Sequence, residues 1–334
     1  YFIIKGKEKV VISQETKIND ILYINSTPDK KIPLQCVLKS ISKEGYQSSR
    51  NNTIALNKIT TDFEPSNKDL ATVDKSTVYK VSVRILGFGS KSETTWPVPL
   101  FILFRALGCE TDKDIIYHII DNNGSEEDKN IMKMLIPSVE EAYEIRTETE
   151  AIIYMASHLN NTYYAQNEEK KINYIKDNVL KEFLNHLDND LQKKIYYLGL
   201  MVNKLLKCRL GIIPYDDRDS YINKRFDTPG YLLGNLTFQC FYKIKKDIKN
   251  FITKEVNSGI WNLNNNYEDI INEINIHKII KSSYLENILK GALATGNWGM
   301  KINASKQGVS QVLNRLTYPS TISHLRRVQT PSDN

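Results

Sequence analysis

Cysteine is scarce in this sequence, and the few cysteines show no pairing pattern. The chain has four cysteines in 334 residues, and no two of them form a C-x-x-C pair. They are Cys36, Cys109, Cys208 and Cys240. Each lies among apolar neighbours, so we expect buried, free thiols in a reducing compartment. The spacing does not fit a zinc-binding motif, and no zinc site is predicted in this chain.

Long apolar runs are also missing. No stretch approaches the roughly 20 apolar residues that a membrane-spanning helix needs, and no signal-peptide pattern is present. The sequence starts at Tyr1, inside a strand-like pattern, and stops shortly after the turn-like Thr330–Pro331. We therefore expect it to be part of a longer polypeptide. Its frequent lysine, asparagine and isoleucine are typical of an AT-rich genome.

Motifs of catalysis and cofactor binding are absent. The five histidines have no metal-ligand spacing, and no serine or cysteine nucleophile constellation is visible. Gly87–Ser90 lacks the Gly-Lys-Ser/Thr ending of a phosphate-binding loop and is interpreted as a strand end. The three aspartates of Asp216–Asp219 resemble an acidic metal cluster. Because Lys224 and Arg225 lie nearby, ion pairs and a helix cap are the better interpretation.

Charge is unevenly distributed along the chain, whose formal net charge is +6. Residues 121–150 hold nine acidic residues against three basic ones, a net charge of −6, and we expect them to face solvent or a basic partner. Residues 291–334 hold five basic residues against one acidic residue, a net charge of +4. An anion-facing surface is therefore expected at the C-terminal end.

The hydrophobic pattern predicts an α+β protein with strands first and helices later. A hairpin is predicted over residues 1–12, and strands over most of 20–86, with the clearest alternation at Tyr79–Ile85. Helices are predicted at residues 100–107, after Thr111, after Ser125, and at 148–159, 170–187, 189–208, 229–256 and 278–293. Thr111 with Asp114, and Ser125 with Asp128, are helix-start patterns. Loops and short helices are expected beyond Thr295.

The C-terminal segment 291–334 combines glycine with cationic and amide side chains. Gly296, Gly299 and Gly308 allow a tight turn or a close approach to a ligand. Lys301 and Lys306 lie on the loop between them. Side chains of this kind can bond to phosphate oxygens, sugar hydroxyls or base edges. A solvated basic surface is the alternative, because five cations in 44 residues form a modest patch.

Two pairs within this segment have helical spacing. Gln311 and Arg315 are four residues apart, so they are predicted to share one helix face. His324 and Arg327 are three residues apart and are predicted to share another. We therefore expect two short faces that present hydrogen-bonding and cationic groups together.

The same segment resembles the fork region of the second-largest, β-type subunit of multisubunit DNA-directed RNA polymerases, in its RNA polymerase II form. The strings that carry the resemblance are Ala294–Gly299, Gly308–Arg315 and Ser323–Arg327. Earlier strings fit the same family. Tyr1–Val10 resembles the end of the first protrusion segment, Phe104–Gly108 resembles the lobe, and Asp216–Arg225 resembles the return to the protrusion.

The resemblance implies a domain order and a role. It implies the end of the first protrusion segment at 1–15, the lobe at 16–208, the second protrusion segment at 209–290 and a truncated fork at 291–334. The lobe is then inserted in the protrusion domain. In this family these domains line the cleft and position the template DNA and the RNA–DNA hybrid during transcription. The first fork loop corresponds to about Met300–Gln307 and approaches the hybrid.

The resemblance also implies which side chains meet nucleic acid. They are Lys301, Lys306, Gln311, Asn314, Arg315, His324, Arg326 and Arg327. Gln311, Asn314, His324 and Arg327 correspond to positions that line the rifampicin pocket of the bacterial β subunit. Asn314 stands where bacteria usually have an aspartate, which puts rifampicin sensitivity in doubt.

No catalytic residue is expected in this chain. In the family, the catalytic Mg²⁺ is held by aspartates of the largest subunit, and Zn²⁺ sites can occur elsewhere in the full-length second subunit. The complex is a nucleotidyltransferase, and the chain supplies positioning. The implied partners are the largest subunit, other polymerase subunits, template DNA and nascent RNA, and no membrane. The implied location is the nucleus, or the virion or cytoplasmic factory of a virus.

Two other functions fit the residues alone. One is a stand-alone nucleic-acid-binding module, and the other is a structural scaffold whose C-terminal segment is an ordinary surface. The source is also open, because a eukaryotic nuclear polymerase II and the similar enzyme of a large DNA virus both fit. The divergent region 20–80 and the insertions rich in asparagine and lysine favour the virus.

Overall fold

The structure of the protein is a computed structural model, and it describes most of the chain. The described residues are 1–27, 31–42, 49–59, 78–85, 88, 96–120, 124–159, 168–258, 276, 283–299 and 306–330. They form two compact units. One unit combines residues 1–18 with residues from 219 onward, and the other lies between residues 19 and 218. Both units contain strands and helices, so the predicted α+β class is confirmed. The four named domains stay a prediction.

The unit between residues 19 and 218 is built on a five-stranded antiparallel sheet. Its strands, in spatial order, are β4 (Leu22–Ser26), β5 (Leu34–Ser40), β6 (Arg50–Ile59), β7 (Val78–Arg84) and β8 (Val98–Pro99). Val81 and Val83 on β7 are fully buried, as their alternation predicts. Ser82 between them is also buried, so both faces of this strand are covered near its end.

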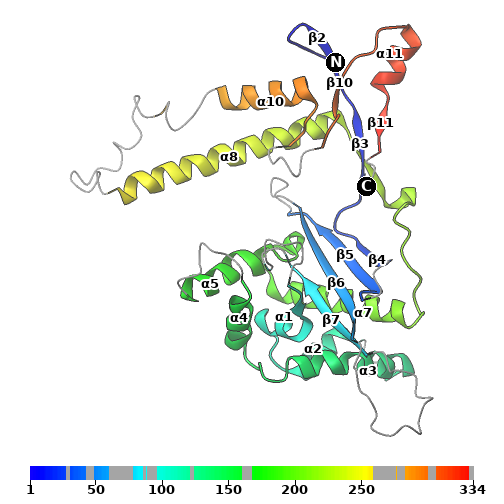
Figure 1. Cartoon of the computed structure of the whole chain (residues 1–334), viewed down its shortest axis with the longest axis vertical. Helices are drawn as coiled ribbons and strands as arrows, with labels where there is room; N and C mark the ends of the chain where they lie inside the picture. The colour runs from blue at the N-terminus through cyan, green and yellow to red at the C-terminus, as the bar shows by residue number, and fades with distance from the viewer. Residues whose placement is uncertain are drawn as a thin grey trace. The chain divides into compact units, whose positions relative to one another are not determined.

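Helices complete this unit (Figure 1), and two of them begin at the predicted caps. The main ones are α1 (Leu100–Ala106), α2 (Asp112–Ile119), α3 (Glu126–Glu141), α4 (Glu148–Ser157) and α7 (Leu191–Arg209). The Thr111 side chain accepts a hydrogen bond from the backbone N–H of Asp114, and Ser125 does the same for Asp128. Each cap satisfies a backbone donor that the first helical turn leaves unpaired. All four cysteines are buried and free, as predicted.

The single helix predicted over 170–187 is wrong. The chain forms α5 (Glu168–Tyr174), a π-helical turn (Ile175–Val179), α6 (Leu180–Glu182) and a 3-10 turn (Asn185–Leu187). The cause lies on α7, where the fully buried Lys194 donates to the carbonyl oxygens of Leu180 at 2.8 Å and Lys181 at 2.9 Å. Burial lowers the pKa of Lys194 to about 8. Leu184 then takes a left-handed conformation with φ of 48°, which ends the regular helix.

In the other unit, residues 7–17 form the central strands of two three-stranded sheets (Figure 1). β2 (Lys7–Val11) lies between β1 (Phe2–Ile4) and β10 (Ser310–Val312). β3 (Ser13–Lys17) lies between β9 (Lys224–Asp227) and β11 (Val328–Gln329), with β11 parallel to it. The predicted hairpin over residues 1–12 is confirmed, and its turn is Lys5–Gly6, both with positive φ.

Two helices pack beside these sheets. α8 (Pro229–Asn257) confirms the predicted long helix, and α10 (Ser283–Thr295) lies against it. Their buried leucines Leu232, Leu236 and Leu293 join Trp298 and Val309 in a small apolar core. The asparagine-rich segment 259–275 lies outside the described residues.

The C-terminal segment contains strands that the sequence did not predict. Gln311 lies on β10 opposite Val10, and Arg315 lies beyond the strand, so the predicted shared helix face is wrong. His324 lies on α11 (Tyr318–Leu325), and Arg327 follows the end of that helix. The strand forms because the edge of β2 offers backbone partners to residues 310–312, which no local pattern reveals.

Arg105, within the string that resembles the lobe, is a buried structural residue. Its side chain is 3% exposed and forms an ion pair with Asp112 at 2.5 Å. Its remaining donors bond to the carbonyl oxygens of Glu110, Ala142 and Ile145. One guanidinium therefore satisfies the backbone of two connections, the one after α1 and the one after α3.

We expect Arg105→Met to destabilise the unit between residues 19 and 218 by about 3 kcal/mol, because it leaves the buried carbonyl of Ala142 and two partly buried carbonyls without a donor. Native-state hydrogen exchange of the α1 and α3 amides measures this free energy of opening. The matched control is Arg146→Met, which removes an exposed arginine next to Ile145 and should change opening by less than about 0.5 kcal/mol. Equal effects of the two variants would refute the assigned role.

Candidate nucleic-acid interface

The glycine-rich string after α10 is a buried junction. Gly296 has φ of 80°, and a Cβ there would lie 2.6 Å from the carbonyl oxygen of Ser310. Only glycine fits this position without a backbone shift. Trp298 is 6% exposed, and its Nε1–H donates to the carbonyl oxygen of Leu232 at 2.9 Å. The predicted close approach is thus found at Gly296, but it brings β10 against α10 within the chain.

Three of the residues predicted to bind nucleic acid bond to one another. The backbone N–H of Asn314 donates to Nδ1 of His324 at 3.1 Å. Nε2 of His324 lies 3.0 Å from Oε1 of Gln311, and Nε2 of Gln311 donates to the carbonyl oxygen of Gly308 at 3.1 Å. His324 is 5% exposed. Its pKa is lowered by burial and, to a smaller extent, by the positive charge of Arg327.

Asn314 has a second, local role. Its Oδ1 accepts hydrogen bonds from the backbone N–H of Leu316 at 2.9 Å and from Oγ of Ser320 at 3.2 Å. Its carbonyl oxygen accepts one from Oγ1 of Thr321 at 2.7 Å. These contacts shape the turn that leads into α11, where Thr317 forms the helix cap. Asn314 therefore acts mainly on its own chain.

Arg315 has an acidic partner that the sequence did not indicate. Its Nε and Nη2 donate to the two carboxylate oxygens of Glu8 on β2, at 2.7 and 2.9 Å. The guanidinium also lies 5.3 Å from the ring centroid of Tyr1. The hydrogen bond from Arg315 is the main cause of the lowered pKa of Glu8. Arg315 is half exposed, so it can still meet an anion that competes with Glu8.

Of the two lysines in the predicted set, only Lys306 lies within the described residues. Lys306 forms an ion pair with Asp227 on β9 at 2.7 Å. Its backbone pairs with that of Trp298, which closes the loop between them. Lys301 lies outside the described residues.

Among the described cations of the predicted nucleic-acid-binding set, Arg326 and Arg327 have no carboxylate partner. Both are exposed, and neither side chain forms a salt bridge or hydrogen bond within the described part of the chain. They directly follow α11, and His324 at the end of that helix is fixed to β10 by its bond to Gln311. This arrangement holds two free guanidinium groups near a well-ordered hydrogen-bond network.

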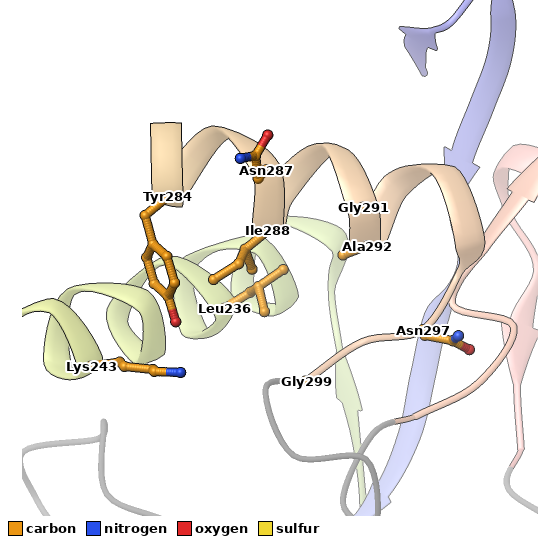
Figure 2. A pocket seen from close by; sticks show the side chains of 9 residues that line it. All are labelled: Leu236, Lys243, Tyr284, Asn287, Ile288, Gly291, Ala292, Asn297 and Gly299. Carbon is orange, nitrogen blue, oxygen red and sulfur yellow. The ribbon is translucent and has the colours of Figure 1, made fainter. Parts of the chain in front are cut away.

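A groove of about 340 Å³ lies between α8, α10 and the residues that follow α10. Figure 2 shows Tyr284 reaching from α10 toward Lys243 on α8, and Ile288 facing Leu236. Nζ of Lys243 lies 5.5 Å from the ring centroid of Tyr284, whose hydroxyl is the main cause of the raised pKa of this lysine. Lys243 is thus one more cation of this unit, and no sequence motif indicated the groove that it lines.

The aspartates of Asp216–Asp219 have partners within the chain. The carboxylate of Asp216 accepts the backbone N–H of Ile24 at 2.8 Å, and Lys224 pairs with Glu15 at 2.6 Å. The hydrogen bond with Glu15 is the main cause of the raised pKa of Lys224, and the negative charge of Asp219 raises it further. The predicted ion pairs and helix cap of this cluster otherwise stay a prediction. Among the described residues, no group of three or more His, Cys, Asp or Glu could hold a metal ion. Within the same ranges, every helix is too short or too polar to cross a membrane.

Comparison with known proteins gives one consistent result. The family described as RNA polymerase Rpb2, domain 2 matches residues 19–227. DNA-directed RNA polymerase II subunit 2 of Arabidopsis thaliana is 35% identical over 99% of the chain and 26% of its own length. Subunit 2 of the DNA-directed RNA polymerase of Acanthamoeba polyphaga mimivirus is 31% identical, over 99% of the chain and 26% of its own length.

An archaeal relative shows the same coverage. Rpo2 of Sulfolobus acidocaldarius is 30% identical over 98% of the chain and 25% of its own length. The chain therefore spans about a quarter of the length of the curated relatives it matches. The similarity extends through the C-terminal segment as well as the part that the family model matches.

The Arg315–Glu8 contact yields a pKa prediction. Because the folded pKa of Glu8 is lowered below 4.5, its stabilising contribution is complete above that pH and is lost as pH falls through the folded value. We expect Arg315→Gln to return the pKa of Glu8 to about 4.5, measured by carboxyl ¹³C NMR titration. Lys7→Gln removes a neighbouring charge on β2 without this hydrogen bond and is the control. An unchanged Glu8 pKa in Arg315→Gln would contradict the assignment.

Proposed function

Since the chain belongs to the RNA polymerase Rpb2 family, we propose that it serves within the second-largest subunit of a DNA-directed RNA polymerase. In this proposal the assembled enzyme is a nucleotidyltransferase, and this chain lines the cleft. Its C-terminal segment positions template DNA and the RNA–DNA hybrid. The partners are then the largest subunit, the other polymerase subunits, and the nucleic acids themselves.

The observation that carries this proposal is the exposed pair Arg326–Arg327 at the end of α11. Two guanidinium groups without carboxylate partners are suited to phosphate oxygens, which they can bind through several N–H donors. Their attachment is well ordered, because α11 begins at a capping box and His324 bonds to Gln311 on β10. A cation on a backbone that is already fixed loses less conformational entropy on binding a phosphate than a cation on an unstructured segment.

The remaining predicted cations take a smaller part in the proposal. Arg315 and Lys306 are held by Glu8 and Asp227, so a phosphate must compete with a carboxylate for each of them. Their contribution to affinity is therefore smaller than that of Arg326 or Arg327. They can still set the position of the strand and the loop on which they lie.

The chemistry itself is assigned to other parts of the enzyme. We propose that the catalytic Mg²⁺ is held by the largest subunit and that any Zn²⁺ of the second subunit lies outside this chain. The residues of this chain bind and orient the nucleic acid. Orientation alone can supply a large part of the rate enhancement of phosphoryl transfer. The site of action is then the nucleus, or a viral factory or virion if the source is a virus.

We expect Arg327→Ala, in the complete polymerase, to shorten the half-life of the elongation complex and to reduce the salt dependence of its stability. Loss of one phosphate contact should lower the slope of log stability against log salt by ~1. The measurement is dissociation of a labelled RNA–DNA hybrid complex over a range of salt concentrations.

Lys129→Ala is the control, because it removes the same charge from an exposed ion pair on α3. It should leave the salt slope unchanged. The same slope for the parent enzyme and Arg327→Ala would exclude a phosphate contact by this arginine. It would favour the scaffold function for the C-terminal segment.

A further inference from the structure

The hydrogen bonds that connect Asn314, His324, Gln311 and Gly308 have only one possible direction. The series starts at a backbone N–H, which can only donate, and ends at a backbone carbonyl oxygen, which can only accept. Nδ1 of His324 must therefore accept from Asn314, so the proton of a neutral ring lies on Nε2. Nε2–H then donates to Oε1 of Gln311, and the Gln311 amide nitrogen faces Gly308.

We propose that neutral His324 is a positioning residue that orients the Gln311 side chain so that its amide NH2 group donates to the nucleic acid. The amide oxygen of Gln311 accepts from His324, and one amide hydrogen is bonded to Gly308. No described residue accepts the second amide hydrogen, and Gln311 is partly exposed. The group it can bind is a hydrogen-bond acceptor, such as a phosphate oxygen, a 2′-hydroxyl oxygen or a base acceptor. This inference rests on the proposed function.

The alternative is that His324 binds the nucleic acid directly as a cation, as the resemblance implied. Its burial speaks against this role, because only 5% of the residue is exposed and both ring nitrogens are already bonded within the chain. Protonation at Nδ1 would also remove the acceptor of the Asn314 N–H. A charged ring therefore breaks the series at its first bond.

The electrostatic surroundings agree with a neutral ring. α11 packs against β2, and the charged residues on the elements and connections around the ring are Lys7, Glu8, Lys9, Arg315, Arg326 and Arg327. The one carboxylate among them, Glu8, is committed to Arg315. Burial and the charge of Arg327 lower the pKa of His324 below its ordinary 6.5. The ring is thus neutral at physiological pH.

The two roles predict opposite responses to pH. If His324 positions Gln311, the half-life of the hybrid complex in the complete polymerase should fall about fivefold as pH is lowered from about 7.5 through the folded pKa of His324. The reason is that Nδ1–H of the charged ring faces the N–H of Asn314, and this repulsion displaces the ring from Gln311 as well. If His324 were a direct cationic contact, the half-life should rise over the same range. A longer half-life at low pH in the parent enzyme, abolished by His324→Gln, would overturn the proposal.

Two substitutions test the two hydrogen bonds of the His324 ring one at a time. The side-chain amide of asparagine can take the place of Nδ1, and that of glutamine can take the place of Nε2. His324→Asn keeps an acceptor for the Asn314 N–H but loses the donor to Gln311. His324→Gln keeps that donor but loses the acceptor. We expect His324→Asn to shorten the half-life about fivefold at pH 7.5 and His324→Gln to change it less than twofold, both without pH dependence. Equal effects of the two variants would refute the positioning role.

A measurement without nucleic acid keeps this inference distinct from the proposed function. In the free polymerase, the Asn314 amide should stay protected from hydrogen exchange in His324→Asn and lose protection in His324→Gln. The reverse pattern would overturn the inference even if Arg327→Ala changes the salt slope. Conversely, the expected exchange pattern with no change of salt slope in Arg327→Ala would refute the proposed function and leave the hydrogen-bond series intact.

Discussion

The long-range pairing of residues 7–17 is the constraint on which the C-terminal site depends. This extended segment is the middle strand of both sheets in its unit, and it pairs with strands about 200 to 320 residues later in the sequence. Glu15 shows how firmly the later strands are held. It is 6% exposed, pairs with Lys224 on β9, and accepts a hydrogen bond from Thr330 beyond β11. Every predicted contact residue that the structure describes is positioned by this pairing.

The same pairing decides which cations are free. Glu8 on β2 meets Arg315 because β10 lies beside β2, and Asp227 on β9 meets Lys306 in the same unit. Two of the basic residues that give the C-terminal segment its charge are therefore neutralised locally. Among the described residues, Arg326 and Arg327 form no ion pair with these carboxylates, which pair with Lys306 and Arg315. A count of charges along the sequence therefore overstates the basic surface, because two of the described cations of the C-terminal segment have carboxylate partners.

Local features of the fold could be predicted from the sequence, and long-range ones could not. The caps at Thr111 and Ser125 and the long helix from Pro229 were predictable, because each depends on residues within a few turns. β10 was missed because Ser310–Val312 becomes a strand only beside β2. The helix break near Leu184 depends on Lys194, a residue on another helix. The candidate site stays a prediction, and Glu8, the partner of Arg315 in the structure, had no signal in the sequence.

The site combines a neutral network with free charge, and each part has a different physical use. A guanidinium attracts phosphate at a distance but does not by itself define a position, because its interaction changes slowly with distance and is screened by salt. A series of hydrogen bonds that is fixed at both ends by backbone groups sets the position of a donor to within a fraction of an ångström. A protonated histidine at position 324 would add a positive charge, but the position of the Gln311 donor would no longer be fixed. In the proposed function, in which this chain holds nucleic acid in register while the reaction takes place elsewhere, the donor with a fixed position is the more useful contribution.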